Sequence, residues 1–282
     1  MGRTADGQWS EEWTPPVFSI DANGKVIGYV NDRTPNNWGR WGADDQVGAV
    51  NMVTAEKRLQ ATRTVKTGRA VCLSREFPKT PAPNNPTPAL HYMKRVARGE
   101  QAGYFGDFYG ISYHGTATTH LDALCHQVWN GKMYNGRPAS EVGSDTKATS
   151  LNIDAAQNGI VTRGVLLDIA KLKGKKWLDA GEPVFVEDLE AAEKAAGVRI
   201  EEGDALMLRL GWYKRRLEEG PPTSGRPGLH AETLPWLRER GVSIVSGDAS
   251  QDVDPSGYPK LGLPVHKVGI VGMGLWLIDA AN

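Results

Sequence analysis

The stretch Tyr113-His-Gly-Thr-Ala-Thr-Thr-His-Leu-Asp-Ala-Leu-Cys-His126 contains three of the six histidines of this 282-residue chain. His120 and Asp122 are two residues apart, so on a strand their side chains share one face. His126 follows four residues after Asp122, and a turn into a helix near Ala123 would bring it back towards the same pocket. Imidazole nitrogen and carboxylate oxygen together suit Zn²⁺, Mn²⁺ or Fe²⁺. The pattern favours a catalytic metal site over the alternative, histidines that cap or pack in a core.

The sequence on either side of this stretch predicts alternating strands and helices. Thr54 is a candidate N-cap for a helix that Gly68 would end, and the Asn23-Gly24 pair predicts a hairpin in the N-terminal region. Five prolines between 78 and 90 predict an extended loop, which is either a surface connection or a flap over a site. The expected strands cover 69–77, 164–168, 205–210 and 242–245, and the expected helices cover 54–67, 186–196 and 232–240.

These elements together predict a mixed α/β layer, since most of the helices precede a strand. Residues 1–37 are rich in Gly, Pro, Asn and Asp and are expected to form an irregular arm. Because no shift in composition marks a boundary after that arm, residues 38–282 are expected to form a single domain.

Charge and composition exclude several classes of protein. Lys plus Arg and Asp plus Glu each number 33, and this zero balance argues against a nucleic-acid binder. Two cysteines exclude a disulfide scaffold and favour a reducing compartment. The polar N-terminus lacks a signal-peptide core, and the apolar run from Val268 to Ile278 is too short and Gly-rich for a membrane span. We therefore expect a cytoplasmic protein with a small-molecule substrate and no membrane or nucleic-acid partner.

The histidine-rich stretch resembles the motif of the cyclase family, which includes bacterial kynurenine formamidase and isatin hydrolase. The family pattern is His-x-Gly-Thr-His-x-Asp-x-Pro-x-His, and His120, Asp122 and His126 match its second His, its Asp and its last His. The resemblance implies a swivelling β/β/α domain with a mixed sheet and flanking helices. Other segments of the chain resemble further blocks of the family: Arg40 to Asn51, Arg163 to Asp168, Gly203 to Trp212 and Pro227 to Leu229.

The resemblance also implies a set of metal ligands. In the family, the first two motif histidines, the Asp, a downstream His and a downstream carboxylate bind metal, here Mn²⁺ or Zn²⁺. His120 and Asp122 match directly, His266 resembles the downstream His, and Asp279 stands where the family usually has Glu. Thr116 occupies the place of the first His, and a hydroxyl is a poorer ligand than an imidazole. His114 could replace that ligand if Gly115 allowed the chain to bend.

Four residues are candidates for contact with the substrate. The last motif histidine, His126, acts as general acid/base in the family, and Trp41 matches a Trp that contacts substrate there. His230 is expected either to cap a helix or to contact substrate. Thr116 is a further candidate for contact with the substrate.

The implied function is hydrolysis of an amide, a cyclic imide or lactam, or a lactone in a small cyclic or aromatic substrate by metal-activated water. A homodimer or homotetramer is implied as well. The alternative is a non-catalytic member that binds a small metabolite through a degenerate metal site, because Thr116 departs from the pattern. Turn formation accounts for the acidic residues of the 248–254 segment. Within the motif, Cys125 next to His126 is expected to be a small buried hydrophobe rather than a nucleophile.

Overall fold

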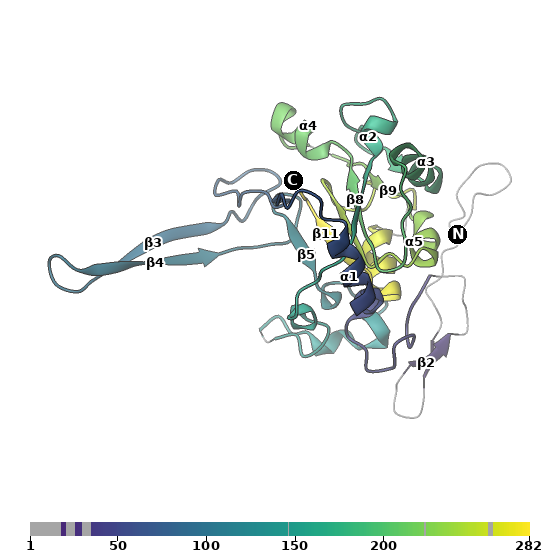
Figure 1. The fold of residues 1–282 in the computed structure, drawn as a ribbon. Helices are drawn as coiled ribbons and strands as arrows, with labels where there is room; N and C mark the ends of the chain where they lie inside the picture. The colour runs from purple at the N-terminus through teal and green to yellow at the C-terminus, as the bar shows by residue number, and fades with distance from the viewer. Residues whose placement is uncertain (1–17, 21–25, 30–34, 146, 223, 259–261) are drawn as a thin grey trace.

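A five-stranded mixed sheet forms the centre of the computed structural model, which describes residues 18–20, 26–29, 35–145, 147–222, 224–258 and 262–282 (Figure 1). The strand order is β5-β11-β10-β8-β6, and β5 runs antiparallel to β11 while the other neighbours are parallel. The sheet confirms the expected mixed α/β architecture. Its strands are β5 (His120–Asp122), β6 (Gly164–Asp168), β8 (Ala205–Arg209), β10 (Ile244–Gly247) and β11 (Trp276–Asp279).

Helices flank this sheet, as expected. Thr54 caps α1 by accepting a hydrogen bond from the Lys57 amide, but the helix ends at Arg63 rather than near Gly68. Lys57 and Ala61 are its buried residues, while Leu59 is 58% exposed. The helices are α1 (Ala55–Arg63), α2 (Ile169–Leu172), α3 (Val186–Ala196), α4 (Trp212–Glu219), α5 (Thr233–Glu239) and the π-helix η6 (Val265–Gly272).

Three two-stranded ribbons complete the strands that the structure describes. The N-terminal hairpin prediction is confirmed, since β1 (Phe18–Ile20) pairs with β2 (Val26–Tyr29) in an antiparallel manner, although its Asn-Gly turn lies outside the described residues. The short strands β7 (Pro183–Val184) and β9 (Gly228–Leu229) pair in parallel. The third ribbon, which was not among the predicted elements, is a hairpin of β3 (Leu90–Ala97) and β4 (Gly103–Gly110) that projects far from the sheet in Figure 1.

The predicted strand at 69–77 is wrong. This segment joins none of the described sheets, because its backbone groups bond to separate partners and not to one neighbouring strand. The Leu73 carbonyl accepts from the amide of Asn282, and the Arg75 amide donates to the Thr119 hydroxyl. The following loop at 78–89 has no regular structure, which confirms the extended loop that the prolines predict.

The segment from Arg40 to Asn51, which resembles a block of the family, packs against the C-terminal part of the chain. The indole nitrogen of Trp276 donates to the Val47 carbonyl at 2.7 Å. Gly48 and Gly274 both have positive φ and lie so close that a Cβ on Gly48 would be 2.4 Å from the Gly274 oxygen. Asp45 accepts hydrogen bonds from the Gly48 amide and the Tyr134 hydroxyl. These contacts give the segment a structural role beside β11.

The described helices include none whose length and hydrophobicity together would suit a membrane crossing.

Candidate metal centre

The sheet brings three candidate ligands together at its β5 edge. His120 and Asp122 are both buried while Leu121 between them is partly exposed, so the two side chains share a face as predicted. In the antiparallel ladder, Asp279 of β11 stands directly opposite His120. Side chains in such a pair lie about 5 Å apart at Cβ. Accordingly, ligand atoms of His120, Asp122 and Asp279 all lie within 4.8 Å of one another.

The carboxylate of Asp122 lies at the centre of the cluster of histidines. Its Oδ1 lies 3.1 Å from His114 Nε2, 3.9 Å from His120 Nε2 and 3.4 Å from His126 Nδ1. Its Oδ2 lies 3.5 Å from His266 Nε2. Four imidazoles, three from the 113–126 stretch and one from η6, therefore surround one buried carboxylate.

His126 returns to the cluster in the way that the spacing predicts. After β5 the chain enters a short 3₁₀ turn, Leu124–His126, and the Ala123 amide donates to His126 Nδ1 at 3.2 Å. Cys125 within this turn is buried, and burial raises the pKa of its thiol. Cys125 therefore lies in the core as a small apolar side chain, as expected.

His114 also joins the cluster, two residues before Thr116. Gly115 adopts a φ of 118°, a conformation that suits glycine, and the chain bends there. The His114 ring then lies edge-on to that of His126, with Nε2 of the first 2.8 Å from Nδ1 of the second. Thr116 lines the cavity in front of the cluster, and Asp122, His114 and His126 form a second group of possible ligands within 4.8 Å.

Asp252 is a member of the site that its sequence context did not reveal. It was interpreted as a turn residue, but its carboxylate is fully buried and accepts from His266 Nδ1 at 2.5 Å. It also accepts from the amides of Val265 and His266 at the start of η6. The carboxylate thereby fixes both the helix end and the imidazole that the helix presents. A lone Asp in a Gly/Ser/Pro-rich segment carries no sequence signal that separates this role from a turn.

The hydrogen bonds of two imidazoles fix which nitrogen faces the cluster. His120 Nδ1 lies 2.9 Å from the Thr118 carbonyl, and His266 Nδ1 lies against Asp252. A carbonyl or carboxylate oxygen accepts a hydrogen bond from Nδ1–H, which leaves the Nε2 lone pair of the neutral ring free for a metal. Both Nε2 atoms point towards Asp122. This is the usual outer-shell arrangement of a metal-binding histidine.

The electrostatics favour ionised carboxylates. Burial opposes the ionisation of Asp122, but hydrogen bonds from His114, His126 and His266 hold its pKa well below the ordinary value. Burial likewise opposes the ionisation of Asp279, while His266 at 3.3 Å lowers the pKa of that carboxyl. For His266 itself, burial opposes the charged form, yet Asp122, Asp252 and Asp279 raise its pKa well above the ordinary value. The centre concentrates negative charge where a cation would sit.

Two predicted substrate contacts are not brought to this place. Trp41 packs partly against the hydrophobic core with the Arg40 guanidinium 4.8 Å from its ring centroid. His230 is buried between Phe185 and Tyr258, at ring-centroid distances of 5.0 and 5.6 Å. Neither residue is among those that line the cavity at the cluster.

This cavity, of about 280 Å³, opens directly onto the cluster. His114 and His126 are partly exposed to it, with 52% and 34% of their side chains accessible, whereas His120 and Asp122 lie at its floor. The donor set of imidazole nitrogens and ionised carboxylates fits a divalent ion of the zinc or manganese type. The residues that the structure brings together are His114, His120, Asp122, His126, His266 and Asp279, and Gly115, Thr116, Gln127, Arg226, Ser250 and Leu263 complete the lining.

Comparison with known proteins identifies relatives of this fold. A family model described as "Putative cyclase" matches residues 43–254. A crystal structure described as a novel cyclase is 28% identical, with a TM-score of 0.76 over 88% of this chain and 86% of that chain. Isatin hydrolase A from Ralstonia solanacearum is 19% identical, with a TM-score of 0.51 over 81% of this chain and 85% of that one, and this likeness is one of fold. Among curated proteins, none matches the sequence significantly.

Proposed function

This chain belongs to the cyclase family, and from that premise we propose that it is a metal-dependent hydrolase. The bond cleaved is an amide, a cyclic imide or lactam, or a lactone in a small cyclic or aromatic substrate. The observation that carries the proposal is the convergence of four imidazoles on the buried carboxylate of Asp122, at the floor of an open cavity. A structural cluster would have no need of such an opening.

The side chains divide into a buried and an accessible set. His120, Asp122, His266 and Asp279 are the buried members and would hold a divalent ion, Mn²⁺ or Zn²⁺. When bound, such an ion would polarise a substrate carbonyl and lower the pKa of a water molecule. Their burial restricts access to the cavity side, so a substrate carbonyl can approach from one direction only.

His126 is placed to move a proton. Its Nδ1 lies 3.2 Å from the Ala123 amide, 2.8 Å from His114 Nε2 and 3.4 Å from Asp122 Oδ1, so Nδ1 faces the cluster and Nε2 is the ring nitrogen left for the substrate. The side chain lines the cavity and is one-third exposed, which allows that nitrogen to reach a leaving group. We assign to His126 the role of general acid/base. His114, in contact with His126 and Asp122, either completes the metal shell or holds the His126 ring in place.

The alternative of a non-catalytic binding protein rests on Thr116. The position of His114 weighs against this alternative, because its Nε2 lies 3.1 Å from Asp122 Oδ1, where it could act as the ligand that Thr116 does not supply. The cluster thus keeps the number of nitrogen donors expected of an active member.

We also propose that the protein is a cytoplasmic homodimer or homotetramer. The β3–β4 hairpin supports an assembly, since it exposes large apolar side chains on a ribbon that two strands alone stabilise poorly. A second copy of the chain would cover them. Light scattering on the purified protein would test this, and a monomer at micromolar concentration would contradict it. The exposed side chains are Leu90, Tyr92, Met93, Val96, Tyr104, Phe105, Phe108 and Tyr109.

The test of the function combines metal content with turnover. The protein is purified after growth with Mn²⁺ or Zn²⁺, its metal is measured, and a panel of N-formyl arylamines, cyclic imides and lactones is assayed. We expect stoichiometric metal and at least one substrate, with His120→Ala and Asp122→Ala losing both. His91→Ala is the matched control, because His91 pairs with Asp107 on the hairpin away from the cluster. Folded His120→Ala and Asp122→Ala variants with full metal and full activity would refute the assignment.

A further inference from the structure

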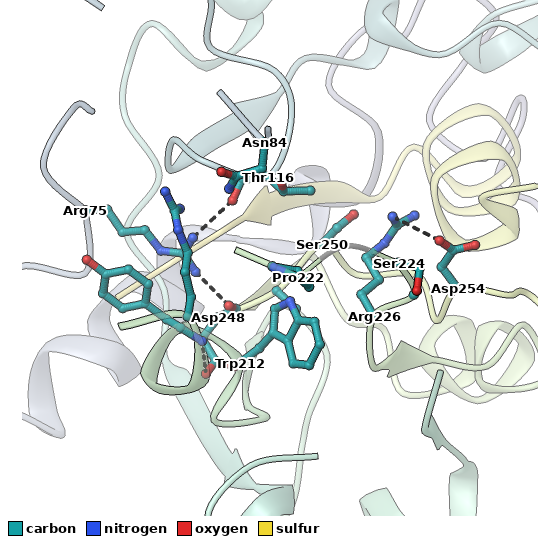
Figure 2. A pocket seen from close by; sticks show the side chains of 14 residues that line it. Arg75, Asn84, Thr116, Trp212, Pro222, Ser224, Arg226, Asp248, Ser250 and Asp254 are labelled. Carbon is teal, nitrogen blue, oxygen red and sulfur yellow. Dashed lines mark hydrogen bonds and ion pairs between the residues drawn. The ribbon is translucent and has the colours of Figure 1, made fainter. Parts of the chain in front are cut away.

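A second cavity, of about 210 Å³, adjoins the metal centre and is rich in arginine (Figure 2). Arg75, Arg216 and Arg226 line it. Thr116, Ser250 and Arg226 line this cavity and also the cavity of the metal centre. Because the two cavities share these walls, a small molecule bound at the metal cluster can extend into the arginine-rich one.

No carboxylate among the residues that the structure describes is in direct contact with the Arg75 guanidinium. This group is buried and donates to the carbonyl oxygens of Thr116, Asp248 and Ala281, which are neutral acceptors. The face of the guanidinium lies 4.0 Å from the ring centroid of Tyr213. Figure 2 shows the bonds to Thr116 and Asp248 as dashed lines. Arg75 is therefore a fixed, rigid cation in the wall.

Arg216 adds a second cation beside the first. Its guanidinium donates to the carbonyl of Ala117 at 3.3 Å, and it has no carboxylate partner among the described residues. Burial, together with repulsion from Arg216, lowers the pKa of Arg75 to about 10. The third cation, Arg226, has a partner in half-exposed Asp254 at 3.6 Å. Two of the three guanidinium groups thus lack a counter-ion in contact.

The buried carboxyl of Asp248 does not supply that counter-ion. Its two oxygens accept from the backbone amides of Leu210 and Tyr213, at 2.7 and 3.4 Å. Burial raises its pKa, which disfavours the negative form. The carboxyl thus binds the backbone at the start of α4. A negatively charged ligand could therefore pair with Arg75 and Arg216.

Neutral groups complete a site for a polar ligand with a planar body. The side-chain oxygen of Asn84 is buried without a hydrogen-bond partner among the described residues, and the residue lines this cavity. Trp212 contributes a mostly buried indole to the wall. Two unmatched guanidinium groups and an aromatic wall are the parts that a carboxylate on a short or cyclic stem requires, while the Asn84 oxygen can accept from an N–H or O–H donor elsewhere on the same ligand.

We propose that this arginine cavity binds a carboxylate of the substrate, so that the enzyme acts on acidic amides, imides or lactones. The scissile carbonyl lies at the metal cluster and the carboxylate lies against Arg75 and Arg216. This inference rests on the proposed hydrolase function for the position of the carbonyl, but the anion site itself stands on the arginine geometry. Bidentate pairing of guanidinium with carboxylate would give both affinity and orientation.

Succinate is the probe, since one carboxylate can enter each cavity, and propionate carries a single carboxylate. Both are titrated by calorimetry into Mn²⁺-loaded protein and into protein stripped with chelator. We expect succinate to bind the loaded protein more tightly than propionate. Arg216→Gln should weaken succinate binding about ten- to a hundredfold, the range for a charged hydrogen bond, in both forms of the protein. Arg216→Lys should restore part of the loss.

Lys214→Gln is the matched control, because Lys214 carries an exposed positive charge on α4 and does not line the cavity. Equal succinate affinity for wild type and Arg216→Gln, or an equal loss with Lys214→Gln, would overturn the proposal. Inorganic phosphate is titrated in parallel, and phosphate that binds through Arg216 without competing with succinate would also overturn it. If the protein hydrolyses nothing and succinate still depends on Arg216, the proposed function fails while the anion site stands.

Discussion

The clearest test of the metal centre is the substitution Asp252→Asn, since Asp252 contacts a candidate ligand without being one. The carboxylate accepts from Val265 N at 2.6 Å through Oδ1, and from His266 N and Nδ1 at 3.1 and 2.5 Å through Oδ2. An Asn side chain has one acceptor oxygen, and its NH₂ group cannot accept. Whichever way the amide is turned, an N–H donor of the η6 start or of the imidazole faces another donor.

The consequence depends on which donor loses its partner. If the NH₂ faces His266 Nδ1, the ring is driven towards the tautomer with its proton on Nε2, the nitrogen directed at Asp122. That proton would block coordination. If the NH₂ faces Val265, the first turn of η6 loosens and the imidazole moves. Loss of an outer-shell partner typically weakens metal binding about 10- to 100-fold, which corresponds to about 1.4–2.7 kcal/mol.

The assay is a chelator-competition titration with Zn²⁺ or Mn²⁺, with ¹⁵N NMR of the histidine rings to follow the tautomer. Thermal melting of the metal-free proteins separates a loss of affinity from a loss of fold. Asp168→Asn is the control, because Asp168 caps α2 through the Lys171 amide and does not touch the cluster. Equal metal dissociation constants for wild type and Asp252→Asn would refute the role assigned to Asp252.

Three further predictions concern stability. Asp204 is fully buried against Lys57 and Arg163, and although burial opposes its ionisation, their hydrogen bonds lower its pKa. The ionised carboxylate therefore stabilises the fold above its unfolded pKa, and this effect is lost as the pH falls through its folded pKa. In urea titrations, Asp204→Ala should lower the free energy of unfolding by about 3–5 kcal/mol at neutral pH and flatten its dependence on pH in the acid range. An unchanged pH dependence would contradict this. Gly274→Ala should destabilise by more than about 1 kcal/mol because of its positive φ and the nearby Tyr134 ring, and a Tm at or above that of wild type would argue against this contact. Thr54→Ala should remove the α1 cap at a cost of about 1 kcal/mol in the same titration, and no loss would mean that the cap is dispensable.

The sequence predicts those parts of the site that depend on the spacing of residues a few positions apart. The His120–Asp122 pair and the return of His126 depend on strand and turn geometry over a few residues, and both are found as expected. Asp252 and His266 are 14 positions apart and meet through the start of a π-helix, which no short-range periodicity encodes. His266 and Asp279 were assigned from the family resemblance alone.

The β3–β4 hairpin shows a different limit of sequence analysis. Alternation of apolar and polar residues predicts a strand because one face is usually buried. This hairpin exposes side chains on both faces, so Tyr92 and Met93 are adjacent in sequence yet 48% and 53% exposed. The pattern that marks a strand is absent because the burial that creates the pattern is absent within this chain. Conversely, the segment at 69–77 has strand-like residues but no neighbouring strand to pair with.

The position of β11 determines when the two halves of the metal centre can meet. In the described sheet, β11 lies between β5 and β10. The chain reaches β11 only about 150 residues after β5, and such long-range pairing is slow to form. During synthesis on the ribosome, His120 and Asp122 therefore leave the exit tunnel long before their strand has a partner. The complete set of candidate ligands consequently exists only after β11 has docked, so it cannot guide the earlier steps of folding.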